Sequence, residues 1–199
     1  MNIAILASGN GSNFEAIAKA IRRGQIRAEV KLLITDKPQA FARFRAKKLK
    51  IKDIFINPDN YPSRLLFDKK LVEVLKIDKI DLVVLAGYMR ILSPYFVKKY
   101  KNKILNIHPS LLPRFKGVNA IARAFNHGSK LTGVTVHFVD SKVDHGPVIL
   151  QSSILIKKSM KLKSLEKEIH KLEHKLYPLA IKLFAEKKLK VRGRKVAIN

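Results

Sequence analysis

The sequence predicts an α/β protein with a doubly wound, mostly parallel sheet, flanking helices and a long C-terminal helix. Three observations favour this fold. Short apolar runs alternate with helical patterns in the first half, a glycine-rich turn joins the first run to the first helix, and an apolar stripe marks a long helix near the end. The chain has 199 residues and is 47% hydrophobic, which suffices for a substantial core. No break in composition divides it, so we expect a single domain over 1–199.

The first half predicts strand and helix in turn. Residues 2–7 form an apolar run that meets glycines too soon for helical periodicity, which indicates a buried strand. Ser12 and Glu15 then have the spacing of a capping box at a helix start. We expect further strands at 30–35, 54–56, 81–86 and 104–107, and helices in the low 40s and at 64–75. Such alternation is typical of a parallel sheet with both faces covered.

The second half predicts a short helix at 119–128 and strands at 132–139 and 148–155. From Ser164 onwards, apolar residues repeat at steps of three and four, which predicts the buried stripe of a long helix. Pro178 should bend this helix. The predicted stripe consists of Leu165, Ile169, Leu172, Leu176, Leu179 and Leu183.

Composition excludes some functions and leaves others open. The chain has no cysteine, so it offers no disulfide, thiolate metal site or thiol nucleophile. Its net charge of +26 is compatible with a protein that binds nucleic acid. The basic residues are dispersed along the chain, however, which favours a general bias in composition over a nucleic-acid-binding surface. A basic surface would still attract anionic substrates. The opening MNIAILASG is too short and lacks the basic leader of a signal peptide, so we expect a cytoplasmic protein with no membrane partner.

The loop Ser8-Gly9-Asn10-Gly11-Ser12-Asn13 lies between the first predicted strand and helix. Backbone N–H groups and the positive end of a helix dipole can hold a phosphate at such a turn. The loop lacks the lysine of a Walker A motif and the spacing of a dinucleotide fingerprint. The alternative interpretation, a tight turn that binds no ligand, is therefore not excluded by this loop alone.

Asn106 and His108 are two residues apart at the carboxyl end of the strand expected at 104–107. Their side chains therefore share a face at the edge where open α/β sheets bind ligands. An amide donor beside an imidazole suits a reaction in which a carbonyl oxygen gains negative charge. Pro109 and Pro113 should make the following loop rigid.

Several segments together resemble the glycinamide ribonucleotide formyltransferase family. They are SGNGSN at 8–13, GYMRIL at 87–92, NIHPSLLP at 106–113, the stretch 134–151, and Leu172-Glu173-His174 with Tyr177-Pro178. The resemblance runs from the first strand to about Leu189. NIHPSLLP is shared by related formyl-folate enzymes, so the nucleotide-loop glycines and the C-terminal helix carry the narrower assignment.

The resemblance implies a Rossmann-like fold and formyl transfer from 10-formyltetrahydrofolate to the amine of 5-phosphoribosylglycinamide in purine biosynthesis, without a metal. It places phosphate binding in residues 1–100 and catalysis with folate binding in residues 101–199. It implies catalytic roles for Asn106, His108 and Asp144, ribonucleotide binding by Gly11, Ser12, Asn13 and Glu173, and folate contacts by Arg64, Met89, Arg90, Ile91, Leu92 and Asn106.

Asp144 and Asn119 need separate comment. Asp144 stands next to a turn, where an aspartate is usually solvated; if it approaches His108, its charge should favour the protonated imidazole. Family members commonly carry a histidine in a G-x-H pattern after the LLP loop, whereas this chain has Asn119, which cannot titrate. We expect activity to survive this change. For His137 we favour a structural role over one supporting the catalytic residues.

Each of three other functions has a sequence requirement of its own. A formyltransferase acting on methionyl-tRNA should need a further nucleic-acid-binding domain, a formyl-folate hydrolase should need a regulatory domain, and a basic nucleic-acid-binding protein should carry a recognisable binding motif. The run from His170 to His174 fits a zinc peptidase pattern, but it falls in the helix that resembles the formyltransferases. We therefore expect small-molecule substrates, no specific nucleic acid, and a monomer or homodimer.

Overall fold

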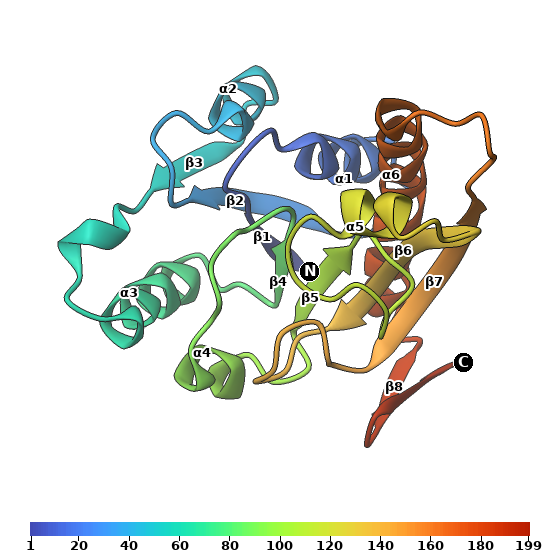
Figure 1. The fold of residues 1–199 in the computed structure, drawn as a ribbon. Coiled ribbons are helices and arrows are strands. Elements are labelled where there is room, and N and C mark those ends of the chain that lie inside the picture. The colour runs from blue at the N-terminus through green and yellow to red at the C-terminus, as the bar shows by residue number, and fades with distance from the viewer. The chain divides into compact units, whose positions relative to one another are not determined.

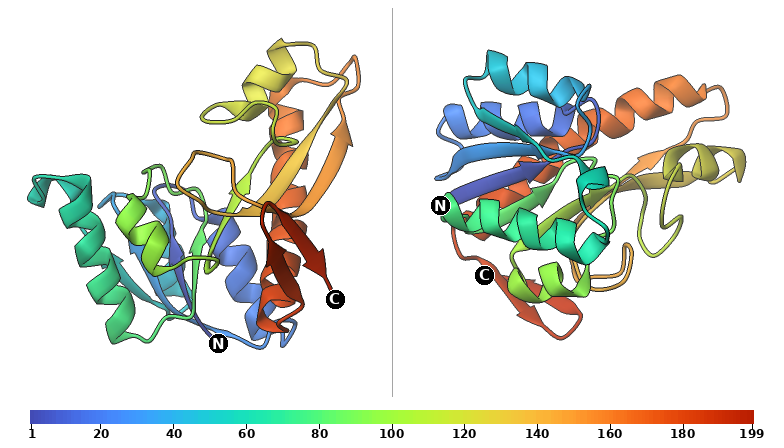
Figure 2. Two further views of the ribbon diagram at one scale, coloured as in Figure 1. Left: turned by 90° about the horizontal axis from the view of Figure 1, so that it is seen from below. Right: turned by 90° about the vertical axis from the view of Figure 1, so that its left-hand side faces the viewer.

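The computed structural model describes residues 1–199 and contains two compact units, Met1–Asn106 and Ile107–Asn199. Figures 1 and 2 show their ribbons, coloured from blue at the N-terminus to red at the C-terminus. The boundary falls inside one strand, so Asn106 and His108 belong to different units although they are two residues apart. A single domain over 1–199 stays a prediction.

The first unit is built on parallel strands. They are β1 (Asn2–Leu6), β2 (Glu29–Thr35), β3 (Lys52–Phe55), β4 (Leu82–Leu85) and the first residues of β5 (Ile104–His108). Their order is β3-β2-β1-β4-β5, and each pairing is parallel. The order reverses direction between β1 and β4, and both of these strands are buried in the core.

Helices cover both faces of these strands. They are α1 (Ser12–Arg22), α2 (Phe41–Lys48), α3 (Arg64–Ile77) and α4 (Pro94–Lys99), with a 3-10 turn η1 (Pro58–Asn60) before α3. α1 contacts α2, α3 contacts α4, and Figure 1 shows the two pairs on opposite sides of the strands. This arrangement confirms the predicted doubly wound, mostly parallel sheet with flanking helices. η1 and α4 were not predicted from the sequence.

The start of α1 differs from its prediction. Gly11 is the N-cap, with a left-handed φ of 74°, and no side chain makes a capping hydrogen bond. Ser12 is already helical, and Glu15 forms ion pairs with Lys19 and Arg45 instead of reaching back to the backbone. The predicted capping box is therefore wrong, because two cations compete for the carboxylate that would have closed it.

The second unit combines two antiparallel strands with the long helix. β6 (Leu131–Phe138) pairs with β7 (Val148–Leu155), and α6 (Leu162–Ala185) packs against both. α5 (Ala120–Asn126) also contacts α6. The chain ends in a hairpin of β8 (Leu189–Arg192) and β9 (Lys195–Ile198), which the sequence analysis did not predict. No helix in the chain is both long and apolar enough to cross a membrane.

The buried face of α6 also differs from the predicted stripe. Leu179 belongs to that stripe but is 45% exposed, while the charged Glu173 is buried. The prediction followed aliphatic residues only, whereas steps of four from Leu165 trace the true face of the helix. The helix continues through Pro178. Its buried residues are Leu165, Ile169, Glu173, Tyr177, Ala180 and Ile181.

Candidate active site

Two predicted binding segments meet at the carboxyl edge of the first unit's strands. The loop 8–13 follows β1 and the segment 87–92 follows β4, where the strand order reverses. The Ser8 N–H donates to the Gly87 carbonyl over 3.1 Å, and the Met89 N–H donates to the Ser8 hydroxyl over 2.9 Å. Open α/β sheets bind their ligands at such a reversal, so both segments lie where a ligand is expected.

Gly11 shapes the loop that leads into α1. Its φ of 74° is in the left-handed region, and a Cβ added there would lie 2.6 Å from the Cβ of Ala42 in α2. The Ala42 N–H also donates to the Gly9 carbonyl over 3.1 Å. Gly11 thus permits both the turn and the approach of α2. Ser12 and Asn13 follow as the first residues of α1, where the helix dipole favours an anion.

Arg45 holds the same loop from α2, a role that the sequence analysis missed. Its Nε and Nη2 atoms each lie 2.9 Å from an oxygen of Asn10, the backbone carbonyl and the side-chain amide respectively. Its Nη1 pairs with Glu15, which Lys19 also contacts over 2.6 Å. Glu15 lies in the first turn of α1, where its charge would repel a phosphate. The two cations offset that repulsion.

The first turns of α3 lie beside the segment 90–93. Asp68 accepts a hydrogen bond from the Ser93 N–H, and the guanidinium of Arg90 lies 4.8 Å from the centre of the Phe67 ring. Burial raises the pKa of Asp68, against the hydrogen bonding of Ser93 and the charges of Arg64 and Arg90. The structure therefore brings Arg64 and Arg90, both predicted to contact folate, to one carboxylate.

The remaining predicted folate residues differ in exposure. Met89 and Ile91 are 70% and 57% exposed, whereas Leu92 is buried. Large apolar side chains that stay exposed beside a binding edge offer surface to a ligand. Asn106 lies at the same carboxyl edge, paired in register with Leu85 at the end of β4. It is therefore the residue of the predicted catalytic set that the first unit contributes.

In the second unit, His108 lies between two hydrogen-bond acceptors. Its Nδ1 is 3.3 Å from Oδ2 of Asp144, and its Nε2 is 2.9 Å from the Phe115 carbonyl oxygen. Both contacts are satisfied only when the imidazole carries a proton on each nitrogen. The structure thus brings Asp144 to His108, as the charge argument from the sequence requires.

Burial changes the expected titration of this pair. It lowers the pKa of His108 below the ordinary value of 6.5, while the charge of Asp144 and the Phe115 carbonyl act to raise it. Asp144 therefore acts in the predicted direction, but burial outweighs it. For Asp144 itself, burial raises the pKa, yet hydrogen bonds from His137 and Gly117 bring it below its ordinary value. Asp144 is accordingly ionised at neutral pH.

The backbone around Asp144 fixes its carboxylate. Asp144 has a positive φ of 48°, and its Oδ2 accepts from the Gly117 N–H over 2.8 Å. At Gly146 a Cβ would come within 1.9 Å of the Phe138 carbonyl oxygen, so this turn requires glycine. Asn119 has a φ of 55° and caps α5 without a side-chain hydrogen bond. Asparagine tolerates that conformation.

The loop after His108 is anchored on β6 and β7. The hydroxyl of Thr135 donates to the Ser110 carbonyl over 2.7 Å and accepts from the Leu112 N–H over 3.1 Å. The side-chain amide of Gln151 reaches both the Thr135 hydroxyl and the Leu112 carbonyl, over 2.8 and 3.1 Å. These bonds add to the stiffness expected from the two prolines and hold the backbone that carries His108.

His137 approaches the other oxygen of Asp144. Its Nε2 lies 3.7 Å from Oδ1 of Asp144, and its Nδ1 lies 2.7 Å from the Phe138 carbonyl. The register of β6 and β7 shifts between Val136 and His137, and such irregularities re-aim side chains near active sites. The contact gives His137 a place beside the catalytic candidates rather than in the core alone.

Glu173 is a charged residue on the buried face of α6. Its Oε2 lies 2.9 Å from Nδ1 of His170, and this hydrogen bond raises the pKa of His170 although burial acts against it. The charge of Glu173 also acts to raise the pKa of His108. Its carboxylate is therefore within electrostatic range of the His108 and Asp144 pair.

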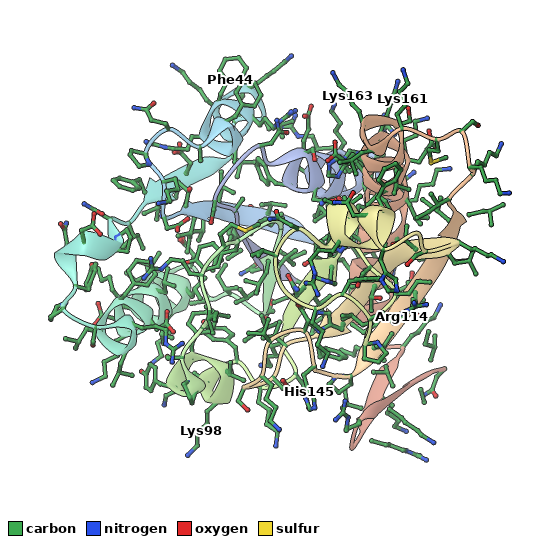
Figure 3. The ribbon with its side chains drawn as sticks, viewed as in Figure 1. Phe44, Lys98, Arg114, His145, Lys161 and Lys163 are labelled. Atoms are coloured by element: carbon green, nitrogen blue, oxygen red, sulfur yellow. The ribbon has the colours of Figure 1, made fainter.

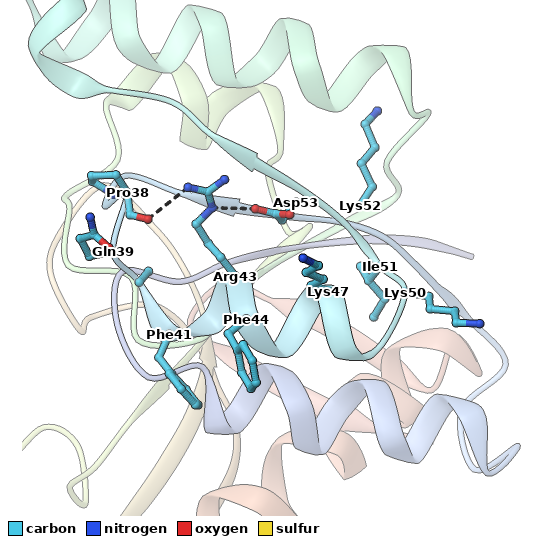
Figure 4. Close-up of a pocket in the computed structure, with 11 residues that line it drawn as sticks. Pro38, Gln39, Phe41, Arg43, Phe44, Lys47, Lys50, Ile51, Lys52 and Asp53 are labelled. Carbon is cyan, nitrogen blue, oxygen red and sulfur yellow. Dashed lines mark hydrogen bonds and ion pairs between the residues drawn. The ribbon is translucent and has the colours of Figure 1, made fainter.

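An open cavity of about 640 Å³ lies beside α2 and β3, and none of the predicted site residues lines it (Figure 4). Arg43 in its lining donates to Asp53 over 2.7 Å and to the Pro38 carbonyl over 3.1 Å. Phe41 and Phe44 point away from that ion pair in Figure 4. The lining carries four basic side chains, of Arg43, Lys47, Lys50 and Lys52, and a single carboxylate, that of Asp53.

Comparison with known proteins places the chain in a family. A family model described as formyl transferase matches residues 1–181. The chain is also 44% identical over 179 residues to phosphoribosylglycinamide formyltransferase of Bacillus subtilis (strain 168), an alignment that covers 90% of this chain and 92% of the relative. The chain belongs to the formyl transferase family.

Other relatives of this formyl transferase agree. It is 39% identical over 191 residues to phosphoribosylglycinamide formyltransferase of Escherichia coli (strain K12), which covers 96% of this chain and 90% of that protein. A crystal structure of glycinamide ribonucleotide transformylase 1 from Symbiobacterium toebii matches with a TM-score of 0.97 and 42% identity, covering 100% of this chain and 93% of that one. These matches confirm the family resemblance and the fold class predicted from the sequence.

Proposed function

We propose that this formyl transferase moves the formyl group of 10-formyltetrahydrofolate to the amine of 5-phosphoribosylglycinamide, giving formylglycinamide ribonucleotide for purine (IMP) synthesis. The proposal rests on the buried His108 and Asp144 pair, 3.3 Å apart, in a chain whose relatives are named phosphoribosylglycinamide formyltransferases. An ionised aspartate beside an imidazole is an arrangement suited to general acid–base catalysis.

The reaction needs one bond made and one broken. The substrate amine attacks the formyl carbon and forms the new C–N bond, while the bond from that carbon to the folate nitrogen breaks. The amine loses one proton and the folate nitrogen gains one, so the transfer is balanced. In the transition state the formyl oxygen carries negative charge, and the Asn106 amide donates a hydrogen bond to it.

His108 supplies the mobile proton in this proposal. Asp144 holds Nδ1, so Nε2 is the ring atom that donates to the formyl oxygen or passes a proton towards the leaving nitrogen, exchanging the Phe115 carbonyl for the substrate. A pKa lowered by burial makes the neutral form accessible near pH 7, and Asp144 keeps the charged form accessible as well. Both forms are needed if the residue is to relay a proton.

The binding roles are those that the family resemblance implies. Gly11, Ser12 and Asn13 hold the ribonucleotide phosphate at the start of α1, and Glu173 recognises the glycinamide ribonucleotide. Arg64 and the segment Met89, Arg90, Ile91 and Leu92 contact the folate, with Asn106 at the same edge. Support for these roles comes from the junction at Ser8 and the exposed Met89 and Ile91. The proposed mechanism uses no metal, and the enzyme acts as a cytoplasmic monomer or homodimer.

The rival functions gain no comparable support. Figure 3 shows basic side chains projecting from separate elements, including Lys98 on α4 and Lys163 on α6, in line with dispersed charge. The test is a steady-state assay with 10-formyltetrahydrofolate and, in parallel, glycinamide ribonucleotide or methionyl-tRNA as acceptor. We expect turnover with the ribonucleotide only. Turnover with the tRNA alone would replace this proposal with the tRNA alternative.

A further inference from the structure

The turn that carries Asp144 is tied to the C-terminal hairpin through one histidine. His145 follows Asp144, and its Nδ1 lies 2.7 Å from Oδ2 of Asp140 at the other end of the same turn. On its opposite side, Nε2 lies 2.6 Å from Nη1 of Arg194, and Nη2 of Arg194 donates to the His145 carbonyl over 3.3 Å. Arg194 stands just after the hairpin glycine, Gly193, between β8 and β9.

The two partners of His145 fix the direction of its hydrogen bonds. An arginine only donates hydrogen bonds, so Nε2 must be the acceptor, and a carboxylate only accepts, so Nδ1 must carry the proton. The hydrogen bonds therefore run in one direction, from Arg194 through His145 to Asp140. Burial raises the pKa of Asp140, but the hydrogen bond from His145 and that from the Lys142 N–H bring it below its ordinary value.

The hairpin has little packing of its own to explain its place. Most of its residues are exposed or half-buried, and Ile198 is 47% exposed. Isolated two-stranded hairpins are marginally stable in water. β9 contacts β7, which begins just after the Asp144 turn. The contacts of Arg194 with His145 attach the hairpin to the Asp144 turn as well.

The turn gains from such support because its backbone is strained. Asp144 has a left-handed φ of 48°, which aspartate tolerates better than most residues but which still costs free energy that the surroundings must offset. His145 is held at its ring by Asp140 and Arg194 and at its carbonyl by Arg194. A residue fixed at both backbone and side chain restricts the residue that precedes it.

We propose that Arg194 and His145 are positioning residues, through which the C-terminal hairpin holds the Asp144 carboxylate against His108. This inference rests on the proposed catalytic role of Asp144. Neither residue need contact a substrate, because each acts on the turn. Loosening the turn should weaken the influence of Asp144 on His108 and misplace the general acid.

The test compares Arg194→Ala with Arg192→Ala. Arg192 is an exposed residue of β8 in the same hairpin, and its replacement by alanine removes the same charge. The His108 ring is titrated by NMR in both variants and in the unchanged chain, without substrates, and steady-state kinetics are measured separately. We expect Arg194→Ala alone to lower the pKa of His108 and to reduce kcat about tenfold, with smaller changes in KM, since small misplacements of catalytic groups cost up to ~100-fold.

A third variant and a melting measurement separate positioning from unfolding. Arg194→Lys keeps the charge but not the two-pronged contact with His145, so it should fall between Arg194→Ala and the unchanged chain. Thermal melting shows whether each variant is folded at the assay temperature. If Arg194→Ala is folded and matches Arg192→Ala in both the His108 titration and kcat, the inference is wrong. The NMR titration does not depend on turnover, so it tests the inference even if the unchanged chain proves to have another activity.

Discussion

His108 Nδ1 and Asp144 Oδ2 lie 3.3 Å apart, and both side chains are less than a tenth exposed. At this distance and burial the charge of Asp144 acts strongly on the imidazole, although burial itself pulls the pKa of His108 the other way. Burial and the charge of Asp144 therefore oppose each other, and removing either one should move the pKa of His108 in a known direction.

Asp144→Asn removes the effect that raises the pKa of His108. The pKa should fall further below 6.5, so activity that needs protonated His108 should disappear at a lower pH as the pH rises. We expect kcat to fall by about a hundredfold, the size of general acid–base assistance, with smaller changes in substrate affinity. NMR titration of His108 and the pH profile of kcat measure the two effects. Asp59→Asn, the same change at an exposed position, should leave both unaltered; an Asp144→Asn variant that behaves like this control would make Asp144 a turn residue only.

Gly11→Ala should destabilise the fold as well as the phosphate site. The added Cβ meets Ala42 at 2.6 Å, and the backbone has a positive φ. We expect a loss of about 1–3 kcal/mol in the free energy of unfolding, a cost usual for such strain. Gly9→Ala is the matched control, because nothing lies within 4 Å of its added Cβ, and it should stay within about 0.5 kcal/mol. Equal stability of the two variants in urea titration would contradict the packing described for α2.

Arg45→Ala should weaken the ribonucleotide more than the folate. The change releases Asn10 and leaves Glu15 with less compensation near the proposed phosphate position. We expect the Kd of the ribonucleotide to rise by up to about tenfold, or ~1.4 kcal/mol. Arg43→Ala, on the same helix but paired with Asp53, is the control. Adding Glu15→Gln to Arg45→Ala should restore part of the affinity; if it restores none, charge compensation is not the cause.

Glu173→Gln should lower the pKa of His170, which the Glu173 hydrogen bond raises. In the unchanged chain the stability that this pair contributes is present below the unfolded pKa of His170, near 6.5, and is lost as the pH rises through the raised folded value. That pH dependence should vanish in the variant. Tm measured across neutral pH tests it, with Glu168→Gln on the same helix as control. An unchanged profile in Glu173→Gln would show that the pair does not stabilise the fold.

Periodicity predicted the parts of the fold that local sequence determines. The buried strands β1 and β4 are apolar runs, and the alternation of strand and helix defines the doubly wound topology. The predicted capping box is wrong because Glu15 forms an ion pair with Arg45, which lies in another helix. The β8 and β9 hairpin was missed because its short strands are basic and poorly buried, so they lack the apolar pattern of a core strand.

The candidate site was predictable where it is encoded in contiguous motifs. The expectation that Asn106 and His108 share a strand face follows from strand geometry, but the approach of Asp144 to His108 depends on a left-handed backbone that no periodicity reveals. Arg45 and Arg194 act through contacts distant in the sequence, which a single sequence does not show. The burial of Glu173 could have been predicted, because steps of four from Leu165 place it on the buried face of α6. A buried charge is an informative sign of a functional residue.

The most direct test of the central claim follows the formyl carbon itself. 10-Formyltetrahydrofolate labelled with carbon-13 in its formyl group is mixed with glycinamide ribonucleotide and the enzyme, and the label is tracked by NMR. We predict that the signal moves to the amide of formylglycinamide ribonucleotide, and that a folded His108→Ala variant slows this transfer by about a hundredfold or more. Release of the label as formate, or a label that stays on the folate while the ribonucleotide is present, would contradict the proposed formyl transfer.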